Sequence, residues 1–337
     1  MEQQLDTLRH FKQAHQLRIA AADISGILDV VAVSRHLTAL AEAIFNVVVN
    51  IAWKQMVSRF GEPFERTMTD KGFAVIAYGK MGGIELGYDS DLDVVFVHDC
   101  LPGEMTQGPK QIDSRQFYLK LCQRILHIFT SRTVSGVLYE IDNRLRPQGN
   151  SGLLACHIDT YQAYLQEEAW TWEHQALVRT RLVLGEVRLA KQFKAIRQQI
   201  ITQARSLEAL KQDVVNMRSK MRDNLACKQA GMFDLKQGVG GIADIEFITQ
   251  FLVLAHSHQF NDLAECYNNE QLFSLFAQYQ LIDQQQAQIL TQAYRVWREL
   301  YHRQTIQNKD KLIAQQQDDK TAKYASDVAK VWQQVFA

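Results

Sequence analysis

Proline is scarce in this chain and unevenly placed. Only 4 of the 337 residues are proline, whereas an average protein contains about 5%. All four lie in a central window, together with 11 of the 17 glycines. Because Pro and Gly mark turns and interrupt helices, their scarcity on both flanks predicts long helices there. We expect a helical segment over residues 1–60 packed on the core, an α/β core over 61–155, and a C-terminal helical domain over 156–337.

An excess of charge of one sign is also absent. Lys and Arg together number 37, Asp and Glu together number 37, and the formal net charge is zero. A protein whose main task is to coat nucleic acid or an anionic membrane is expected to carry a basic excess. We therefore expect neither nucleic acid nor a membrane as a partner.

Several other signatures are missing. No run reaches the roughly 18 apolar residues of a transmembrane helix, and the first residues contain no apolar signal core. The five cysteines are scattered without a CxxC pair, and the ten histidines form no HExxH pattern. This usage predicts reduced thiols and a cytoplasmic location, and it argues against a disulfide framework and a zinc site.

The central window contains short runs that favour β-structure. Residues Phe73–Tyr78 and Leu92–His98 are apolar and rich in residues that favour strands, as buried strands are. Residues 137–145 alternate with period two, and residues 114–132 carry apolar side chains at helical spacing. Helical patterns continue from Thr160, with a break at residues 237–241. The pattern predicts an α+β fold with a small mixed sheet flanked by helices.

The most informative stretch reads GKMGGIELGYDSDLDVVF. Gly82 and Gly83 follow the first expected strand and precede a helical-looking turn, where exposed backbone N–H groups can cradle phosphates. Ser90 then precedes Asp91 and Asp93 at the start of the second expected strand. Residues two apart on a strand point the same way, so this spacing predicts a side-by-side pair of carboxylates.

Two like charges side by side repel unless a cation lies between them. Divalent cations held by such carboxylates suit in-line phosphoryl or nucleotidyl transfer. The alternative is a solvent-exposed strand start with two acids and no ligand. A calcium loop is excluded because Val94 and Cys100 stand where Gly and Glu are required, and a Walker loop because Met81 follows Lys80.

With a third acidic residue on a later strand, the pattern G-G-x(6)-S-D-L-D resembles the nucleotidyltransferases of the polymerase-β type. The surrounding sequence resembles the glutamine-synthetase adenylyltransferase family, and most of all its C-terminal, adenylylating half. The likeness covers essentially the whole chain and is carried by four segments: AYGKMGGIELGYDSDLDVVFVHD, LYEIDNRLRPQG, EEAWTWEHQALVRTR and GGIADIEFITQFLVL.

This resemblance implies an α+β nucleotidyltransferase core and a specific reaction. AMP passes from ATP to a tyrosine hydroxyl of glutamine synthetase and pyrophosphate is released, with Mg²⁺ or Mn²⁺ as cofactor and the PII signal protein as regulator of nitrogen assimilation. Asp142 matches the third acidic residue and is a candidate to accept the phenol proton. The residues that match the family's catalytic metal ligands and its phosphate loop are Asp91, Asp93 and Asp142, and Gly82, Gly83 and Ser90, respectively.

Three arginines are further candidates for nucleotide binding. Arg144 and Arg146 flank Asp142, where they can contact phosphate or form ion pairs with the acids themselves. Arg179 lies on a helix expected over residues 170–181, beside Trp172. This aromatic–arginine pair can border a nucleotide, but core packing explains it equally simply.

Asp244 and Glu246 open a later helix. Two apart on a helix, they point to different sides. They stand where acids offset the helix dipole, or they support the active site from behind the metal ligands.

Two other functions fit the same residues. The reverse process, phosphorolytic removal of AMP from the modified tyrosine, uses the same carboxylates, so the motif cannot give the direction. A catalytically silent module that senses nucleotide is the other alternative. Loss of one of the three carboxylates would indicate it, and all three are present.

Overall fold

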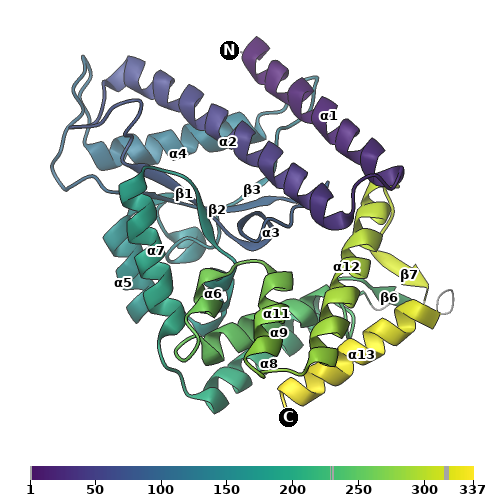
Figure 1. Cartoon of the computed structure of the whole chain (residues 1–337). Helices are drawn as coiled ribbons and strands as arrows, with labels where there is room; N and C mark the ends of the chain where they lie inside the picture. The colour runs from purple at the N-terminus through teal and green to yellow at the C-terminus, as the bar shows by residue number, and fades with distance from the viewer. Residues whose placement is uncertain (1, 228, 230, 315–318) are drawn as a thin grey trace. The chain divides into compact units, whose positions relative to one another are not determined.

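The computed structural model describes residues 2–227, 229, 231–314 and 319–337. The chain forms two compact units, one comprising Met1–Ala169 and Thr180–Arg197, the other Trp170–Arg179 and Gln198–Ala337. Helices and a small mixed sheet together confirm the α+β fold class (Figure 1). The three-domain division stays a prediction, because compactness does not show which segments fold independently.

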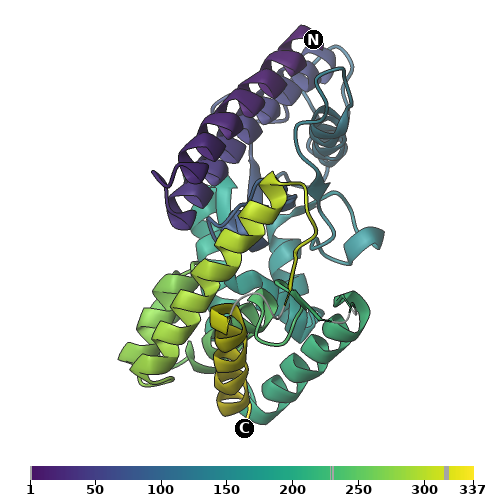
Figure 2. The ribbon, with the colours of Figure 1, turned by 90° about the vertical axis from the view of Figure 1, so that its right-hand side faces the viewer.

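Two long helices open the first unit. They are α1, Glu2–Ile24, and α2, Val30–Phe60, which lie side by side (Figure 2). Asp29 caps α2 by accepting a hydrogen bond from a backbone N–H of the first turn. By length and composition α2 could cross a membrane, yet 56% of its apolar window is buried within the protein. Core helices of globular domains have the same character, so this helix is weak evidence for a membrane span.

The sheet of the first unit is built around the antiparallel pair β1, Phe73–Ala77, and β2, Leu92–His98. Strand β5, Arg181–Leu184, pairs antiparallel with β1. Strands β3, Ile141–Asp142, and β4, Ala155–His157, both pair in parallel with β2, one after the other along its length. The two strands expected first from the sequence are thus confirmed.

Both faces of the central strand pair are buried. One face joins α2 and α4, Ser114–Thr130, in a single core. Because successive strand residues point to opposite faces, Asp93 points away from this core. The strand residues in the core alternate along each strand: Phe73, Val75 and Ala77, and Leu92, Val94 and Phe96.

The strand expected over residues 137–145 is much shorter than its pattern suggests. Only Ile141–Asp142 pairs with β2. Within the segment, the backbone carbonyl of Leu138 accepts a hydrogen bond from a side chain of α1 and not from a neighbouring strand. The carbonyl of Ser135, two residues before the segment, does the same. A period-two pattern shows that side chains alternate between two environments, and it does not show that the backbone finds a partner strand.

Two helices also differ from expectation. The helix at the glycine pair ends there and does not follow it, since α3 spans Gly79–Gly82 and Gly83 is its C-cap. The helix expected over residues 170–181 is α6, Thr171–Val178, and Arg181 instead begins β5. The remaining elements of the first unit are η1, Gly149–Ser151, α5, Ile158–Glu167, and most of α7, Val187–Thr202.

The second unit is mainly helical, as its composition indicated. Its centre is α9, Ile242–His256, against which α6, α8, α11, α12 and α13 pack. The expected break at residues 237–241 is confirmed as the loop before α9. Two short antiparallel strands, β6, Met232–Asp234, and β7, Leu312–Ala314, were not expected. The other helices are α8, Leu207–Leu225, α10, Asp262–Glu265, α11, Asn269–Gln278, α12, Gln284–Ile306, and α13, Asp319–Val335.

His98, at the end of β2, makes the stability of the first unit depend on pH. Its ring stacks on Tyr118 with a centroid distance of 4.9 Å. Burial, with smaller contributions from His157 and Arg115 that outweigh the opposite effect of Asp113, lowers the pKa of His98 from 6.5 to about 3. In the unfolded chain His98 therefore binds a proton below about pH 6.5, whereas in the folded chain it binds one only below about pH 3.

Between about pH 6.5 and pH 3, we expect His98 to lower the free energy of unfolding by up to about 1.4 kcal/mol for each unit by which the pH falls. The measurement is urea unfolding between pH 7 and 4 for the wild type and for His98→Phe, which keeps a stacked ring but cannot titrate. The variant should lose less stability on acidification. Equal slopes for the two proteins would show that His98 is not held neutral.

Candidate active site

Three carboxylates from separate parts of the sequence meet at one end of the sheet. Asp91 lies just before β2, Asp93 lies on it, and Asp142 lies on β3. In the parallel register Asp93 pairs with Asp142, so the two side chains are neighbours on one face. One oxygen from each of the three groups lies within 4.8 Å of the others. The expected pairing of Asp91 with Asp93 and its completion by Asp142 are therefore present in the geometry.

The cluster fits a hard divalent cation by its chemistry and its size. Mg²⁺ takes oxygen ligands at about 2.1 Å, so two ligands of one ion lie at most about 4.2 Å apart. The 4.8 Å within which the three oxygens lie is close to this range. Among the residues that the structure describes, no other group of three His, Cys, Asp or Glu side chains meets the same test. Asp91, Asp93 and Asp142 are thus the residues that can hold Mg²⁺ or Mn²⁺.

Gly79 makes room for the central carboxylate. Its φ is +53°, and a Cβ at this position would lie 2.7 Å from Oδ2 of Asp93. The neighbouring Tyr78 N–H donates to the carbonyl of Asp93 at 2.9 Å, which fixes the backbone on both sides of the contact. Gly79 directly follows the run Phe73–Tyr78 that predicted the first strand. A glycine directly after a buried strand was the available signal.

The glycine pair forms a closed turn. The N–H groups of Gly82 and Gly83 donate to the carbonyls of Tyr78 and Gly79, at 2.9 and 3.0 Å. These two donors are therefore already used within α3, which differs from the exposed cradle that the sequence suggested. Ser90 is buried, and its hydroxyl accepts a hydrogen bond from the N–H of Gly87 at 2.9 Å. It closes the turn that delivers Asp91.

Arg181, on the edge strand β5, binds the turn that contains Gly82 and Gly83. Its guanidinium donates to the carbonyls of Met81 and Gly82, both at 3.2 Å, and forms an ion pair with Glu42 of α2. Three segments that are distant in sequence are joined by one side chain. The sequence pattern did not reveal this role, because helical spacing continues to Arg181, which instead begins β5.

Arg144 and Arg146 have different surroundings. Nε of Arg144 donates to both oxygens of Asp142, at 3.0 and 2.8 Å, and the Arg144 backbone N–H donates to one of them at 2.9 Å. The guanidinium thereby lowers the pKa of Asp142. Arg146 is buried and donates to carbonyls of Asn143, Asn150 and Gly152, so it holds the loop after β3 together. Contact of either arginine with a nucleotide stays a prediction.

The remaining candidates form ion pairs inside the second unit. Arg179 pairs with Glu246. Asp244 accepts from Arg218 at 2.6 Å, from Arg222 at 2.7 Å and from the N–H of Gly240 at 2.7 Å. Only 1% of the Asp244 and Arg218 side chains is exposed. Asp244 and Glu246 thus point to different partners, as their helical spacing requires, and Asp244 fastens the loop before α9 to α8.

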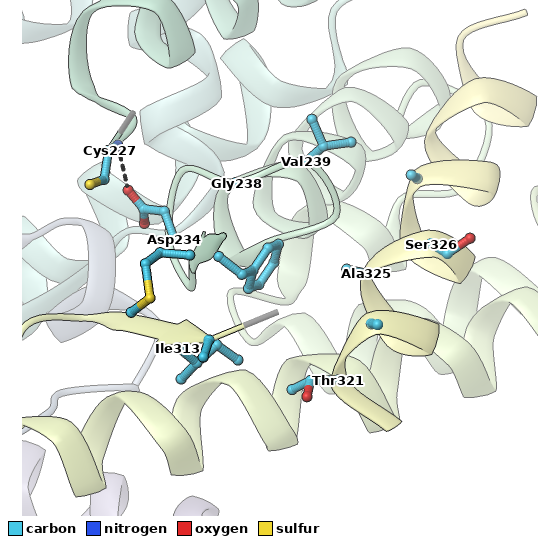
Figure 3. Close-up of a pocket in the computed structure, with 13 residues that line it drawn as sticks. Cys227, Asp234, Gly238, Val239, Ile313, Thr321, Ala325 and Ser326 are labelled. Carbon is cyan, nitrogen blue, oxygen red and sulfur yellow. Dashed lines mark hydrogen bonds between the residues drawn. The ribbon is translucent and has the colours of Figure 1, made fainter. Parts of the chain in front are cut away.

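A cavity of about 400 Å³ lies in the second unit between β6, β7 and α13 (Figure 3). Its wall is mostly small or apolar, with Val239, Ile313 and Ala325 among the lining residues. The carboxylate of Asp234 accepts from backbone N–H groups of Cys227, Lys236 and Gln237. This acid therefore holds the adjoining loop, and the described residues that line the cavity include none of the clustered carboxylates found at the sheet.

The role of Gly79 can be tested by adding one methyl group. Gly79→Ala should weaken divalent-metal binding by about tenfold or more, because the new Cβ displaces a ligand. It should also cost about 1–2 kcal/mol of stability, because an L-residue is strained at this φ. The measurements are calorimetric titration with Mn²⁺ and urea unfolding.

Gly103→Ala is the matched control. Gly103 has a φ of +84°, but a Cβ there meets nothing within 4 Å. This variant should show a similar strain and unchanged metal binding. If both variants bound Mn²⁺ like the wild type, Gly79 would not position Asp93.

The Asp244 network predicts a stability effect. Asp244→Asn should lower the free energy of unfolding by about 3–5 kcal/mol, because the Arg218 charge stays buried without its counter-ion. Glu299→Gln, which breaks an exposed pair with Arg303, should cost less than about 1 kcal/mol. Chemical denaturation compares them. Unchanged stability together with weaker metal binding would instead place Asp244 in support of the active site.

Comparisons with known proteins agree with this geometry. A family model described as glutamate-ammonia ligase adenylyltransferase matches residues 1–196, and one described as GlnD PII-uridylyltransferase matches residues 192–326. The bifunctional glutamine synthetase adenylyltransferase/adenylyl-removing enzyme of Shewanella frigidimarina (strain NCIMB 400) is 53% identical over 307 residues. That alignment covers 91% of this chain and 32% of the relative, so the chain spans about a third of the relative's length. With more than half of its residues matched by the first model, the chain belongs to the glutamate-ammonia ligase adenylyltransferase family.

Proposed function

We propose that this chain transfers AMP from ATP to a tyrosine hydroxyl of glutamine synthetase and releases pyrophosphate. The observation that carries the proposal is the cluster of Asp91, Asp93 and Asp142, whose oxygens lie within 4.8 Å of one another. The family to which the chain belongs, and the name of the Shewanella relative, support the choice of AMP and of this acceptor.

Asp91 and Asp93 bind the cation that accompanies ATP. A divalent cation, Mg²⁺ or Mn²⁺, supplies charge stabilisation at the triphosphate and at the departing pyrophosphate when it is bound. The segment from Gly82 and Gly83 to Ser90 precedes these acids in the chain and is the proposed phosphate-binding loop, although the N–H groups of Gly82 and Gly83 already donate within α3. Arg181 keeps the backbone of this loop in place through the carbonyls of Met81 and Gly82.

Asp142 completes the site from the neighbouring strand. Its guanidinium partner lowers its pKa, which keeps it ionised and makes it a good cation ligand. A carboxylate with a lowered pKa is a weak base, and a tyrosine phenol has a pKa near 10. The lowered pKa thus favours a ligand role for Asp142 over acceptance of the phenol proton.

Arg144 is the proposed phosphate contact of this site. Its side chain is 71% exposed, and its Nε donates to both oxygens of Asp142. A guanidinium in this position can bind a phosphate oxygen on the same side as the acids. For Arg179 the ion pair with Glu246 explains its burial, so its contact with nucleotide is the weakest part of the proposal.

The opposite reaction, phosphorolytic removal of AMP, is the second candidate. The name of the Shewanella relative includes both the transfer and the removal of AMP, and the same three carboxylates can serve either reaction. The sequence likeness to the adenylylating half favours AMP transfer. Control by the PII signal protein and a cytoplasmic location are further parts of the proposal, and they rest on the family resemblance.

One experiment separates the candidates. Purified, unmodified glutamine synthetase is incubated with this chain, ATP and Mg²⁺, and its mass is measured. A mass gain equal to one AMP on a tyrosine is expected. Incubation of the modified enzyme with inorganic phosphate tests the reverse reaction, and a silent module would give neither product.

Asp93→Asn is the matched catalytic control. Loss of one cation ligand should raise the barrier by several kcal/mol and lower the transfer rate by at least about a thousandfold. The fold should persist, as judged by circular dichroism, because the amide fits the same space. A variant that kept more than about a tenth of the wild-type rate would overturn the assignment of the metal site.

A further inference from the structure

Helix α1 contacts the segment that leads to Asp142. Five of its side chains reach the backbone or side chains of Ser131–Tyr139, across more than a hundred residues of sequence. Most of these contacts are hydrogen bonds, whereas helices that only pack together are held by apolar contacts. The side chains are Asp6, Arg9, His10, Lys12 and Gln13.

Two of the contacts are made by cations, of which Arg9 is buried and Lys12 is half-buried. Arg9 is 1% exposed, and its guanidinium donates to the carbonyl of Ser131. The ammonium of Lys12 donates to the carbonyl of Leu138 and lies 4.0 Å from the ring centroid of Tyr139. Burial lowers the pKa of Lys12 to about 8. A buried cation is costly without its partners, so these contacts resist separation of α1 from the segment.

The segment needs such support because β3 is short. Its two residues pair with β2, and one further bond, from the N–H of Leu92 to the carbonyl of Glu140 at 2.9 Å, extends the contact. Strands of globular proteins average about five or six residues. A two-residue strand at the edge of a sheet has few bonds of its own to fix Asp142.

The other end of α1 contacts the segment that precedes the first acid. Asp23, in the last turn of α1, accepts a hydrogen bond from the hydroxyl of Tyr88 at 2.8 Å. Tyr88 lies three residues before Asp91. One straight helix therefore touches both segments that carry the carboxylates.

We propose that α1 is a positioning element that sets the distance between Asp142 and the pair Asp91 and Asp93, and so sets the affinity for the divalent cation. Lys12 and Tyr88 are the positioning residues at its two points of contact. The inference rests on the proposed function only in taking the three acids as a cation site. It assigns to the N-terminal helix a role in the active site beyond packing.

The test measures Mn²⁺ affinity of the full chain by electron paramagnetic resonance, without ATP or acceptor. Lys12→Met keeps the aliphatic stem but removes the ammonium, and it should weaken Mn²⁺ binding by about tenfold, as loss of outer contacts of a metal ligand does. Lys12→Arg keeps a cation and should restore most of the affinity. Tyr88→Phe, at the other contact, should also weaken binding.

Arg18→Met is the matched control on the same helix. Arg18 is exposed and lies outside the contacts described above. The Arg18→Met variant should bind Mn²⁺ with the affinity of the wild type. Thermal unfolding of each variant separates a loss of the site from a loss of the fold, and Tyr88→Phe, a smaller change, serves if Lys12→Met unfolds.

A double-mutant cycle with Asp142→Asn decides whether α1 acts through this acid. If it does, Lys12→Met should have no further effect once Asp142 is replaced. Additive losses, or equal affinities of Lys12→Met and Arg18→Met, would overturn the inference while leaving the proposed function intact. Absence of Mn²⁺ binding by the wild type, or no effect of Asp93→Asn, would overturn the cation site and both proposals.

Discussion

The parallel pairing of β3 with β2 is the interaction on which the candidate site depends. Two residue pairs, Leu92 with Ile141 and Asp93 with Asp142, bring a distant carboxylate beside the Asp91–Asp93 pair. The same register places three like charges within 4.8 Å, which is unfavourable unless a cation shares the site. Arg144 supplies one positive charge to Asp142, and the proposed metal would supply the rest.

Contacts from outside the two strands hold this strained arrangement. Gly79 leaves the space that the carboxylate of Asp93 occupies. Arg181 fixes the turn of α3 from β5, and Arg146 fixes the loop after β3 by bonding to its carbonyls. Helix α1 forms hydrogen bonds with the segments before Asp91 and Asp142. Each of these groups orients an acid or its loop, which is how outer contacts tune a metal site.

The second unit is stabilised in a different way. A buried network joins Asp244 to Arg218, Arg222 and the loop before α9, and Trp297 donates to the carbonyl of Gly240 in the same loop at 3.0 Å. The matches of the two family models overlap at residues 192–196, next to Arg197–Gln198, where the chain enters the second unit for the last time after an earlier passage through it over Trp170–Arg179. The change from one family match to the other thus lies within a few residues of this boundary between the compact units.

The sequence by itself determined the features that depend on local pattern. Apolar runs located β1 and β2, helical spacing located α4 and the start of α9, and the Asp-Leu-Asp spacing located the paired carboxylates. The tertiary structure decided what depends on distant partners. It left the strand before Asp142 paired only at Ile141–Asp142, with the carbonyl of Leu138 bonded to a side chain of α1, and it moved Arg181 into the sheet. It also gave Gly79 its contact with Asp93 and Asp244 its buried arginines. A local pattern records which side chains alternate, but the partner of a backbone carbonyl or a buried charge is set by segments far away in the chain.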